Sequence, residues 1–173
     1  MKNLLWIDME MTGLDVTREV ILEVAAVVTD IELRELETYE TVVKQPQPYL
    51  DAMDEWNTKH HGESGLVAKV PSGREPALVE AHLIGLVDKH FGAEKPVIAG
   101  NSIAQDRLFI DRHMPRFAAR LHYRMLDVTS WKIVMNARFG LEFDKKKSHR
   151  ALDDIRESIG ELKFYLQHVI ASK

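Results

Sequence analysis

Two acidic residues end the first hydrophobic segment of the chain, where a buried strand would be expected to continue. Asp8 and Glu10 follow the run LLWI and stand two residues apart. Residues i and i+2 of a strand point to the same face, so both carboxylates should look out on one side. Like charges at that distance repel each other, and burying either one alone is costly. A bound divalent cation would resolve the conflict, but for this short motif alone a solvent-facing pair at a frayed strand end is the simpler explanation.

Two later segments carry further acidic residues, and a histidine, that could take part in a site for divalent cations. The segment GNSIAQDR follows an apolar run and places Asp106 near the start of a helix, and SHRALDDIRES supplies His149, Asp153 and Asp154. At about 100° per residue, Asp153 points away from the apolar stripe Leu152–Leu166, whereas Asp154 lies on its flank. We therefore expect Asp154 to reach a site at the edge of the sheet and Asp153 to face solvent.

Four carboxylates and a histidine suit the hydrolysis of a phosphodiester. Mg²⁺ and Mn²⁺ prefer oxygen ligands, and two such ions about 4 Å apart can activate a water and stabilise the leaving oxygen. His149, with an ordinary pKa of about 6.5, is suited to deprotonating that water near neutral pH. Zinc is the weaker alternative, because the other histidines form no H-x-x-x-H pattern and the chain has no cysteine.

The elements that must position these residues indicate an α/β fold. Leu4–Asp8, Ile21–Asp30 and Thr38–Val43 are typical of a three-strand antiparallel meander. Periodicity and turn residues then predict helices at Leu50–His61, Ser64–Val70, Pro76–Phe91, Asp106–Leu121 (bent or interrupted at Pro115), from about 127 to Phe139, and Ala151–Ile170, with two further strands at VIAGN and Arg124–Leu126. This order predicts a mixed sheet flanked by helices.

Composition limits the classes of protein to consider. The 173 residues, 45% of them apolar, fit a single domain over 1–173. The longest apolar run, Val24–Val28, is far shorter than the roughly 20 residues of a membrane span, and no signal peptide is visible. The absence of cysteine is compatible with the cytosol. A net charge of −4 argues against a protein that holds long nucleic acid non-specifically. We expect a cytoplasmic protein with no membrane contact.

In this order, the motifs resemble those of the DEDD exonucleases with a histidine, a family with the ribonuclease-H-like fold. That family's motifs are D-x-E, a second aspartate and H-x-x-x-x-D, which match Asp8, Glu10, Asp106, His149 and Asp154. Within the family, five blocks distributed over most of the chain are similar to those of the oligoribonucleases: DMEMTGLD, EWNTKHH, GNSIAQDR, HYRMLDV and SHRALDDIRESI. The resemblance implies a two-metal (Mg²⁺ or Mn²⁺) 3′-to-5′ exoribonuclease that degrades short RNA, dinucleotides especially, to 5′-mononucleotides.

The resemblance also implies residues that bind the substrate. Leu14, Trp56 and His61 match positions that hold bases or a terminal phosphate, and an aromatic face with an aliphatic wedge can sandwich a base without reading its identity. From composition alone, Trp56 could equally be a core residue.

A homodimer is implied in the same way. Ser102, Tyr123 and Arg124 match residues that close around the 5′ end of very short RNA, with Tyr123 and Arg124 contributed by the partner subunit. Without the resemblance, LHYRM would be an ordinary strand with one exposed arginine.

Two other functions remain open on sequence grounds. A proofreading-type DNA exonuclease or a tRNA-trimming exonuclease would share the five catalytic residues but would need an open groove for a longer strand. A non-catalytic nucleotide-binding module is a different class, and the complete set of acidic motifs argues against it.

Overall fold

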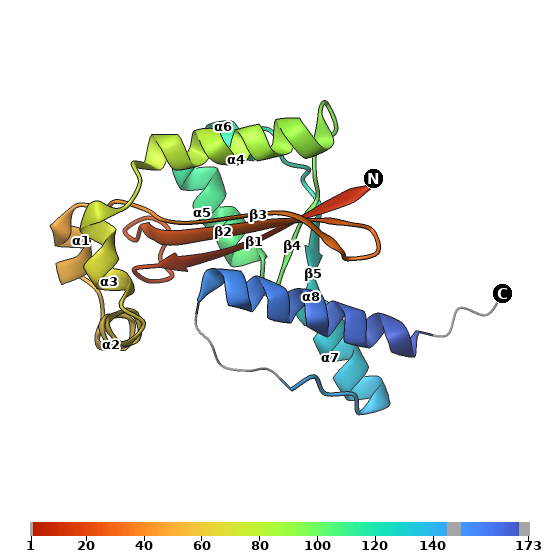
Figure 1. The fold of residues 1–173 in the computed structure, drawn as a ribbon. Coiled ribbons are helices and arrows are strands. Elements are labelled where there is room, and N and C mark those ends of the chain that lie inside the picture. Colours follow the sequence, from red (N-terminus) through yellow and green to blue (C-terminus); the bar gives the residue numbers. More distant parts are fainter. Residues whose placement is uncertain (1, 145–149, 170–173) are drawn as a thin grey trace.

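A mixed sheet forms the centre of the molecule (Figure 1). The structure is a computed structural model that describes residues 2–144 and 150–169. Within these residues the sheet has five strands, β1 (Asn3–Met11), β2 (Ile21–Asp30), β3 (Glu35–Val42), β4 (Ile98–Gly100) and β5 (Met125–Asp127), in the order β3-β2-β1-β4-β5. The first three strands pair antiparallel, and β4 and β5 continue the sheet parallel to β1. The predicted meander with two further strands is confirmed.

Helices cover both faces of the sheet. One face carries α4 (Pro76–Phe91), α5 (Ala104–His113) and α6 (Pro115–Ala118), and the other carries α7 (Val128–Phe139) and α8 (Ala151–His168) (Figure 1). The expected interruption at Pro115 separates α5 from α6. No helix in the described ranges is both long and apolar enough to cross a membrane.

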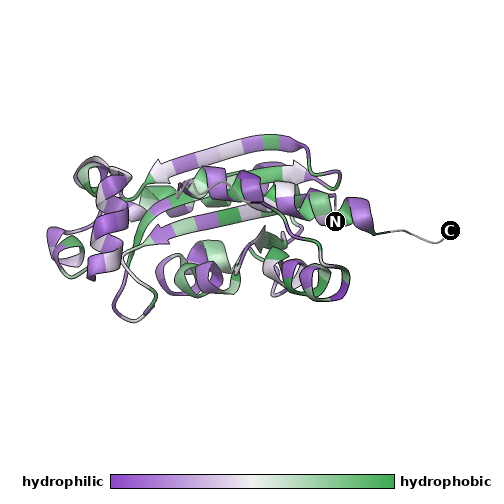
Figure 2. Cartoon of the chain, turned by 90° about the horizontal axis from the view of Figure 1, so that it is seen from below, coloured by the Kyte–Doolittle hydropathy of each residue, from purple (hydrophilic) through white to green (hydrophobic). Residues whose placement is uncertain are grey.

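The alternation of side chains along β1 divides the core into two parts. Leu5, Ile7 and Met9 pack with residues of α4, α5 and α6, whereas Leu4 and Trp6 pack with residues of α7 and α8. Figure 2 shows hydrophobic stretches along the strands and a mixture of hydrophobic and hydrophilic residues along the helices. Because neighbouring strand residues point to opposite faces, the even-numbered positions of β1 face α7 and α8.

The segment between β3 and α4 differs from the sequence prediction. It forms α1 (Gln47–Asp51), α2 (Glu55–Glu63), α3 (Leu66–Lys69) and η1 (Val70–Ser72). The prediction of one helix over Leu50–His61 is therefore wrong, because Asp54 adopts an extended conformation and its side chain accepts a 2.7 Å hydrogen bond from the amide of Asn57. This cap starts a new helix and leaves the first one only five residues long.

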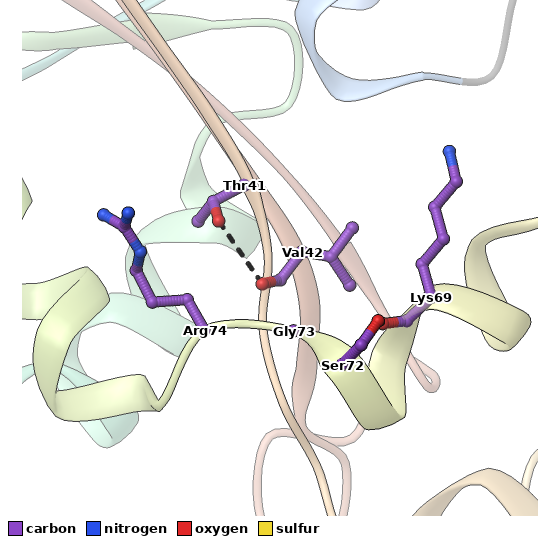
Figure 3. A pocket seen from close by; sticks show the side chains of 6 residues that line it. All are labelled: Thr41, Val42, Lys69, Ser72, Gly73 and Arg74. Atoms are coloured by element: carbon purple, nitrogen blue, oxygen red, sulfur yellow. Dashed lines mark hydrogen bonds between the residues drawn. The ribbon is translucent and has the colours of Figure 1, made fainter.

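The outer edge of β3 is partly covered by the chain that follows η1. The amide of Arg74 donates to the Val42 carbonyl, and the amide of Lys44 donates to the Arg74 carbonyl, both at 2.9 Å. Gly73 permits this approach, because a Cβ there would lie 2.7 Å from the Lys44 nitrogen. A pocket opens at this edge, and Figure 3 shows the side chains of Lys69 and Arg74 pointing away from each other there. Its lining includes none of the predicted site residues.

Candidate active site

Three carboxylates from two distant parts of the chain meet at one end of the sheet. Asp8 and Glu10 occupy even-numbered positions of β1 and therefore face α8, whose first turn carries Asp154. One carboxylate oxygen from each of the three residues lies within 4.8 Å of the other two, and all three side chains are partly buried. Asp153, the other member of the doublet, is exposed, as helix geometry predicts.

Asp106 approaches the same cluster from another helix. It lies in the first turn of α5 and is 6% exposed. Among the neighbouring charges, that of Asp106 contributes most to raising the pKa of Asp8. Asp106 is not one of the three residues whose carboxylate oxygens all lie within 4.8 Å of one another. The charges of the other three predicted acids thus all act on Asp8, and Asp8, Glu10 and Asp154 lie nearest to one another.

Burial and mutual repulsion shift the pKa values of these acids upward. Burial, followed by the charges of Asp106, Glu10 and Asp154, raises the pKa of Asp8 well above its usual value. Burial and then the charges of Asp154 and Glu23 raise the pKa of Glu10 to about 7. Burial raises the pKa of Asp106 to about 7, although hydrogen bonds from backbone amides oppose the shift. An all-oxygen donor set that is reluctant to ionise without a cation fits hard divalent ions.

The predicted base, His149, lies outside the described residues. The next residue, Arg150, is described, and it fixes the start of α8 to the sheet. Its Nη2 lies 2.8 Å from Glu23 Oε1 and 3.1 Å from Glu40 Oε1. Glu23 is fully buried and is the register partner of Glu10 across β1 and β2. Sequence analysis missed this ion pair, although a glutamate inside the apolar run of β2 was a signal of a buried partner.

The loop after β1 presents Leu14 to solvent. This side chain is 75% exposed, which is unusual for leucine. Its backbone carbonyl accepts a 2.8 Å hydrogen bond from Gln105 Nε2, one residue before Asp106. The predicted wedge is therefore anchored beside the acidic cluster by a residue that sequence analysis did not identify.

Trp56 and His61 lie on α2, near the end of β1. Trp56 is 60% exposed and stacks on His60 with ring centroids 3.9 Å apart, so the alternative of a core tryptophan is wrong. His61 is 4% exposed, and its Nε2 lies 2.8 Å from the carbonyl oxygen of Met11, to which it donates. Burial lowers the pKa of His61. The contact ties α2 to the strand that carries Asp8 and Glu10.

The residues predicted to close around a 5′ end lie beyond β4 and before β5. Ser102 has a backbone φ of 52°, a left-handed conformation that is uncommon for a residue with a side chain. Tyr123 is 74% exposed, and the Arg124 guanidinium carbon lies 5.3 Å from the centre of its ring.

The sequence places the chain in an exonuclease family, and its fold is shared with a solved exonuclease. The fold resembles that of exonuclease I from E. coli, solved as a zinc-bound complex with single-stranded DNA, with a TM-score of 0.78 at 16% identity. That alignment covers 97% of this chain and 41% of the other. The family model described as "Exonuclease" matches residues 5–162.

Similarity over the full length narrows the class further. The chain is 46% identical to the oligoribonuclease of Ectopseudomonas mendocina over 173 residues, which cover 97% of this chain and 96% of the relative. It is 46% identical to the oligoribonuclease of Pseudomonas aeruginosa PAO1 over 175 residues, covering 98% and 97% of the two chains. The chain therefore belongs to the exonuclease family and, within it, to the oligoribonucleases.

Proposed function

We propose that this protein is a 3′-to-5′ exoribonuclease that degrades short oligoribonucleotides, dinucleotides especially, to 5′-mononucleotides. The observation that carries the proposal is the convergence of Asp8, Glu10 and Asp154 within 4.8 Å. Full-length similarity to oligoribonucleases supports RNA of a few nucleotides as the substrate. A net charge of −4 agrees with a substrate that has little backbone to neutralise.

Two Mg²⁺ or Mn²⁺ ions are the proposed cofactors. Asp8, Glu10, Asp106 and Asp154 would hold them, because four ionised carboxylates balance two dications and oxygen donors suit both metals. When bound, the ions supply activation of the attacking water and stabilisation of the charge on the leaving oxygen. In the proposed mechanism the partly buried acids fix where this charge is stabilised, since their positions are set by β1, α5 and α8.

The remaining roles belong to residues around the acids. We assign His149 as the group that takes the proton from the attacking water. Leu14 and Trp56, both largely exposed, would hold the two faces of a base. The buried His61 would support this binding site by holding α2 against the end of β1. The stacking of Trp56 on His60 leaves the opposite ring face for a nucleobase.

We propose that the protein acts as a homodimer in the cytoplasm, with residues 1–173 forming one exonuclease domain. Ser102 of one subunit, with Tyr123 and Arg124 of the other, would enclose the substrate's 5′ end. The exposure of Tyr123 and its contact with the Arg124 guanidinium support a role for this pair outside its own subunit. Such a closed end would favour substrates of two to a few nucleotides.

Substrate length gives the sharpest test. Mg²⁺ is titrated against 5′-labelled diribonucleotide and heptaribonucleotide, and kcat/KM is measured for each. We expect the dinucleotide to be cleaved faster. Equal or better turnover of the heptamer would contradict the preference for short RNA. Single-stranded DNA of matched length tests the alternative raised by the fold likeness to exonuclease I; faster cleavage of DNA would favour that alternative.

A further inference from the structure

The loop after β4 is bound to α8 through one amide side chain, that of Asn101. Its Nδ2 donates to Ser158 Oγ at 2.7 Å and to Glu161 Oε2 at 3.1 Å. Its Oδ1 accepts from Thr129 Oγ1 at 3.2 Å. Asn101 thus links the β4–α5 loop to α7 and α8. Hydrogen bonds to both ends of one planar amide leave little rotational freedom for its side chain.

These contacts form part of a longer path with one consistent polarity. The Ser102 amide donates to Thr129 Oγ1 at 2.9 Å, and the Thr129 hydroxyl donates onward to Asn101. Asn101 donates to Ser158, whose own hydroxyl donates to the backbone carbonyl of Asp154 at 2.8 Å. Each hydroxyl gives its one proton in the same direction, so every link is compatible with the next.

The two ends of this path lie in different parts of the proposed site. Ser102 is the residue assigned to the 5′ end of the substrate. Its backbone φ of 52° is stabilised by hydrogen bonds that its amide donates to Asp127 Oδ1 and Thr129 Oγ1. Asp154 is one of the three converging carboxylates. Between them, Ser158 and Glu161 are buried, and the phenol of Tyr165 also donates to Glu161 at 2.9 Å. Solvent therefore does not easily replace the bonds between Asn101 and α8, whereas the bonds of Ser102 at the other end of the path are exposed.

We propose that Asn101 is a positioning residue that couples the 5′-end site at Ser102 to the metal ligand Asp154 through Thr129 and Ser158. This inference rests on the proposed function, which places the substrate's 5′ end at Ser102 and a metal ion at Asp154. The Ser102 hydroxyl lies 3.3 Å from Thr129 Oγ1 and can donate its proton either there or to a phosphate. A 5′-phosphate that orders the loop would then also order the first turn of α8. By linkage, a substrate with a 5′-phosphate strengthens metal binding, and the metal strengthens binding of that substrate.

The coupling is measured as a difference between two substrates. The Mn²⁺ concentration for half-maximal binding is determined from the electron paramagnetic resonance signal of free Mn²⁺, with uncleavable analogues of a 5′-phosphorylated and of a 5′-hydroxyl dinucleotide. The Mn²⁺ concentration for half-maximal activity is determined in parallel with the two cleavable dinucleotides. In the unchanged protein we expect a lower Mn²⁺ midpoint, by about fivefold, with the phosphorylated substrate, which is within the usual range of coupling between two sites. In Ser158→Ala, which alters no residue assigned to the substrate, the two midpoints should converge.

A pair of substitutions at the other end of the path separates coupling from general damage. Thr129→Val keeps the shape of the side chain but removes the hydroxyl, so it should abolish the difference in Mn²⁺ midpoints. Thr129→Ser keeps the hydroxyl and should preserve that difference. Ser72→Ala is the matched control for Ser158→Ala, because it removes a hydroxyl that also bonds to a backbone carbonyl, at 3.0 Å, but at an exposed site on η1. Its two midpoints should match those of the unchanged protein.

The possible outcomes distinguish this inference from the proposed function. If the unchanged protein cleaves neither dinucleotide, the proposed function fails. If it cleaves both with the same Mn²⁺ midpoint, only the coupling is overturned. The coupling is also overturned if Ser158→Ala and Thr129→Val keep the full difference. Loss of stability alone would lower the activity on both substrates and leave the ratio of midpoints unchanged.

Discussion

At the residue scale, the neighbouring acids of α8 provide a matched pair of substitutions. Asp154 belongs to the converging carboxylates, whereas Asp153 is exposed. We expect Asp154→Asn to lower kcat on a dinucleotide by at least about 100-fold, because even residues that only support metal ligands contribute about 10- to 100-fold. Asp153→Asn should stay within about twofold of the unchanged protein. Similar losses in both variants would show that Asp154 is not a ligand.

A second result separates catalytic loss from unfolding. Asp154 is one of the charges that raise the pKa values of Asp8 and Glu10, so an asparagine at this position removes repulsion from the metal-free cluster. The Tm of metal-free Asp154→Asn, measured by differential scanning calorimetry, should therefore equal or exceed that of the unchanged protein. A Tm several degrees lower would mean that Asp154 supports the fold rather than the chemistry.

The pH dependence of the rate tests the assignment of His149. A general base acts only when it is deprotonated, so log kcat should rise with pH up to about 6.5, the ordinary pKa of histidine, and then level off. His149→Ala should remove this limb and lower kcat by about 100-fold or more, while the Mn²⁺ midpoint changes little. Saturating Mn²⁺ at every pH keeps ionisation of the carboxylates from producing the same limb. An unchanged profile in His149→Ala would place the base elsewhere.

At the element scale, the position of α8 depends on two arginines with different surroundings. Arg150 pairs with the fully buried Glu23, whereas Arg156 pairs with Glu35 at a site where both side chains are more than one-third exposed. Arg150→Ala should destabilise the fold at the lower end of about 3–5 kcal/mol, because it leaves a buried charge unpaired while Arg150 itself is partly exposed. Arg156→Ala should cost at most about 1 kcal/mol.

Urea denaturation of the two alanine variants measures this contrast. Replacing Glu23 by glutamine in the Arg150→Ala background removes the unpaired charge, so the double variant should recover part of the lost stability. The same assay shows whether the start of α8 requires the ion pair or only its packing. Equal destabilisation by Arg150→Ala and Arg156→Ala would mean that the burial of Glu23 does not determine how much stability is lost when its arginine is removed.

Sequence patterns predicted the bounds of helices and strands well where neighbouring residues alone determine the element. Periodicity gave Pro76–Phe91 and Ile21–Asp30 with the bounds that the structure has. The break between α1 and α2 was missed, because the apolar spacing ran across it and only the cap at Asp54 reveals it. In the site, i, i+2 spacing placed Asp8 and Glu10 on one face of a strand, and helix phase distinguished Asp154 from Asp153. That these acids meet was implied only by the family resemblance. The contacts of Asn101 with α8 span 57 and 60 residues and have no local signature, so only the fold brings them together.

At the scale of the whole molecule, the acidic cluster should couple stability to pH and to metal. The folded-state pKa values of Glu10 and Asp106 are raised to about 7, above those of the unfolded chain at about 4. Between these values the folded state holds more protons than the unfolded state, so the free energy of unfolding of the metal-free protein falls as pH rises from about 4 to about 7. Above the folded-state values the loss is complete, and stability no longer changes through these groups.

Divalent metal should reverse this dependence, because it binds the ionised carboxylates of the folded state only. Thermal unfolding in a chelator and in excess Mn²⁺ between pH 5 and 8 measures the effect. We expect the Tm gain from Mn²⁺ to be small near pH 5, where protons compete for the same oxygens, and several degrees at pH 8, at about 2–4 °C per kcal/mol for a chain of this size. Asp8→Asn should flatten the metal-free profile and reduce the Mn²⁺ gain, whereas Asp153→Asn should leave both unchanged. A Tm gain from Mn²⁺ that is independent of pH, or equal in Asp8→Asn, would locate the stabilising ion outside the cluster.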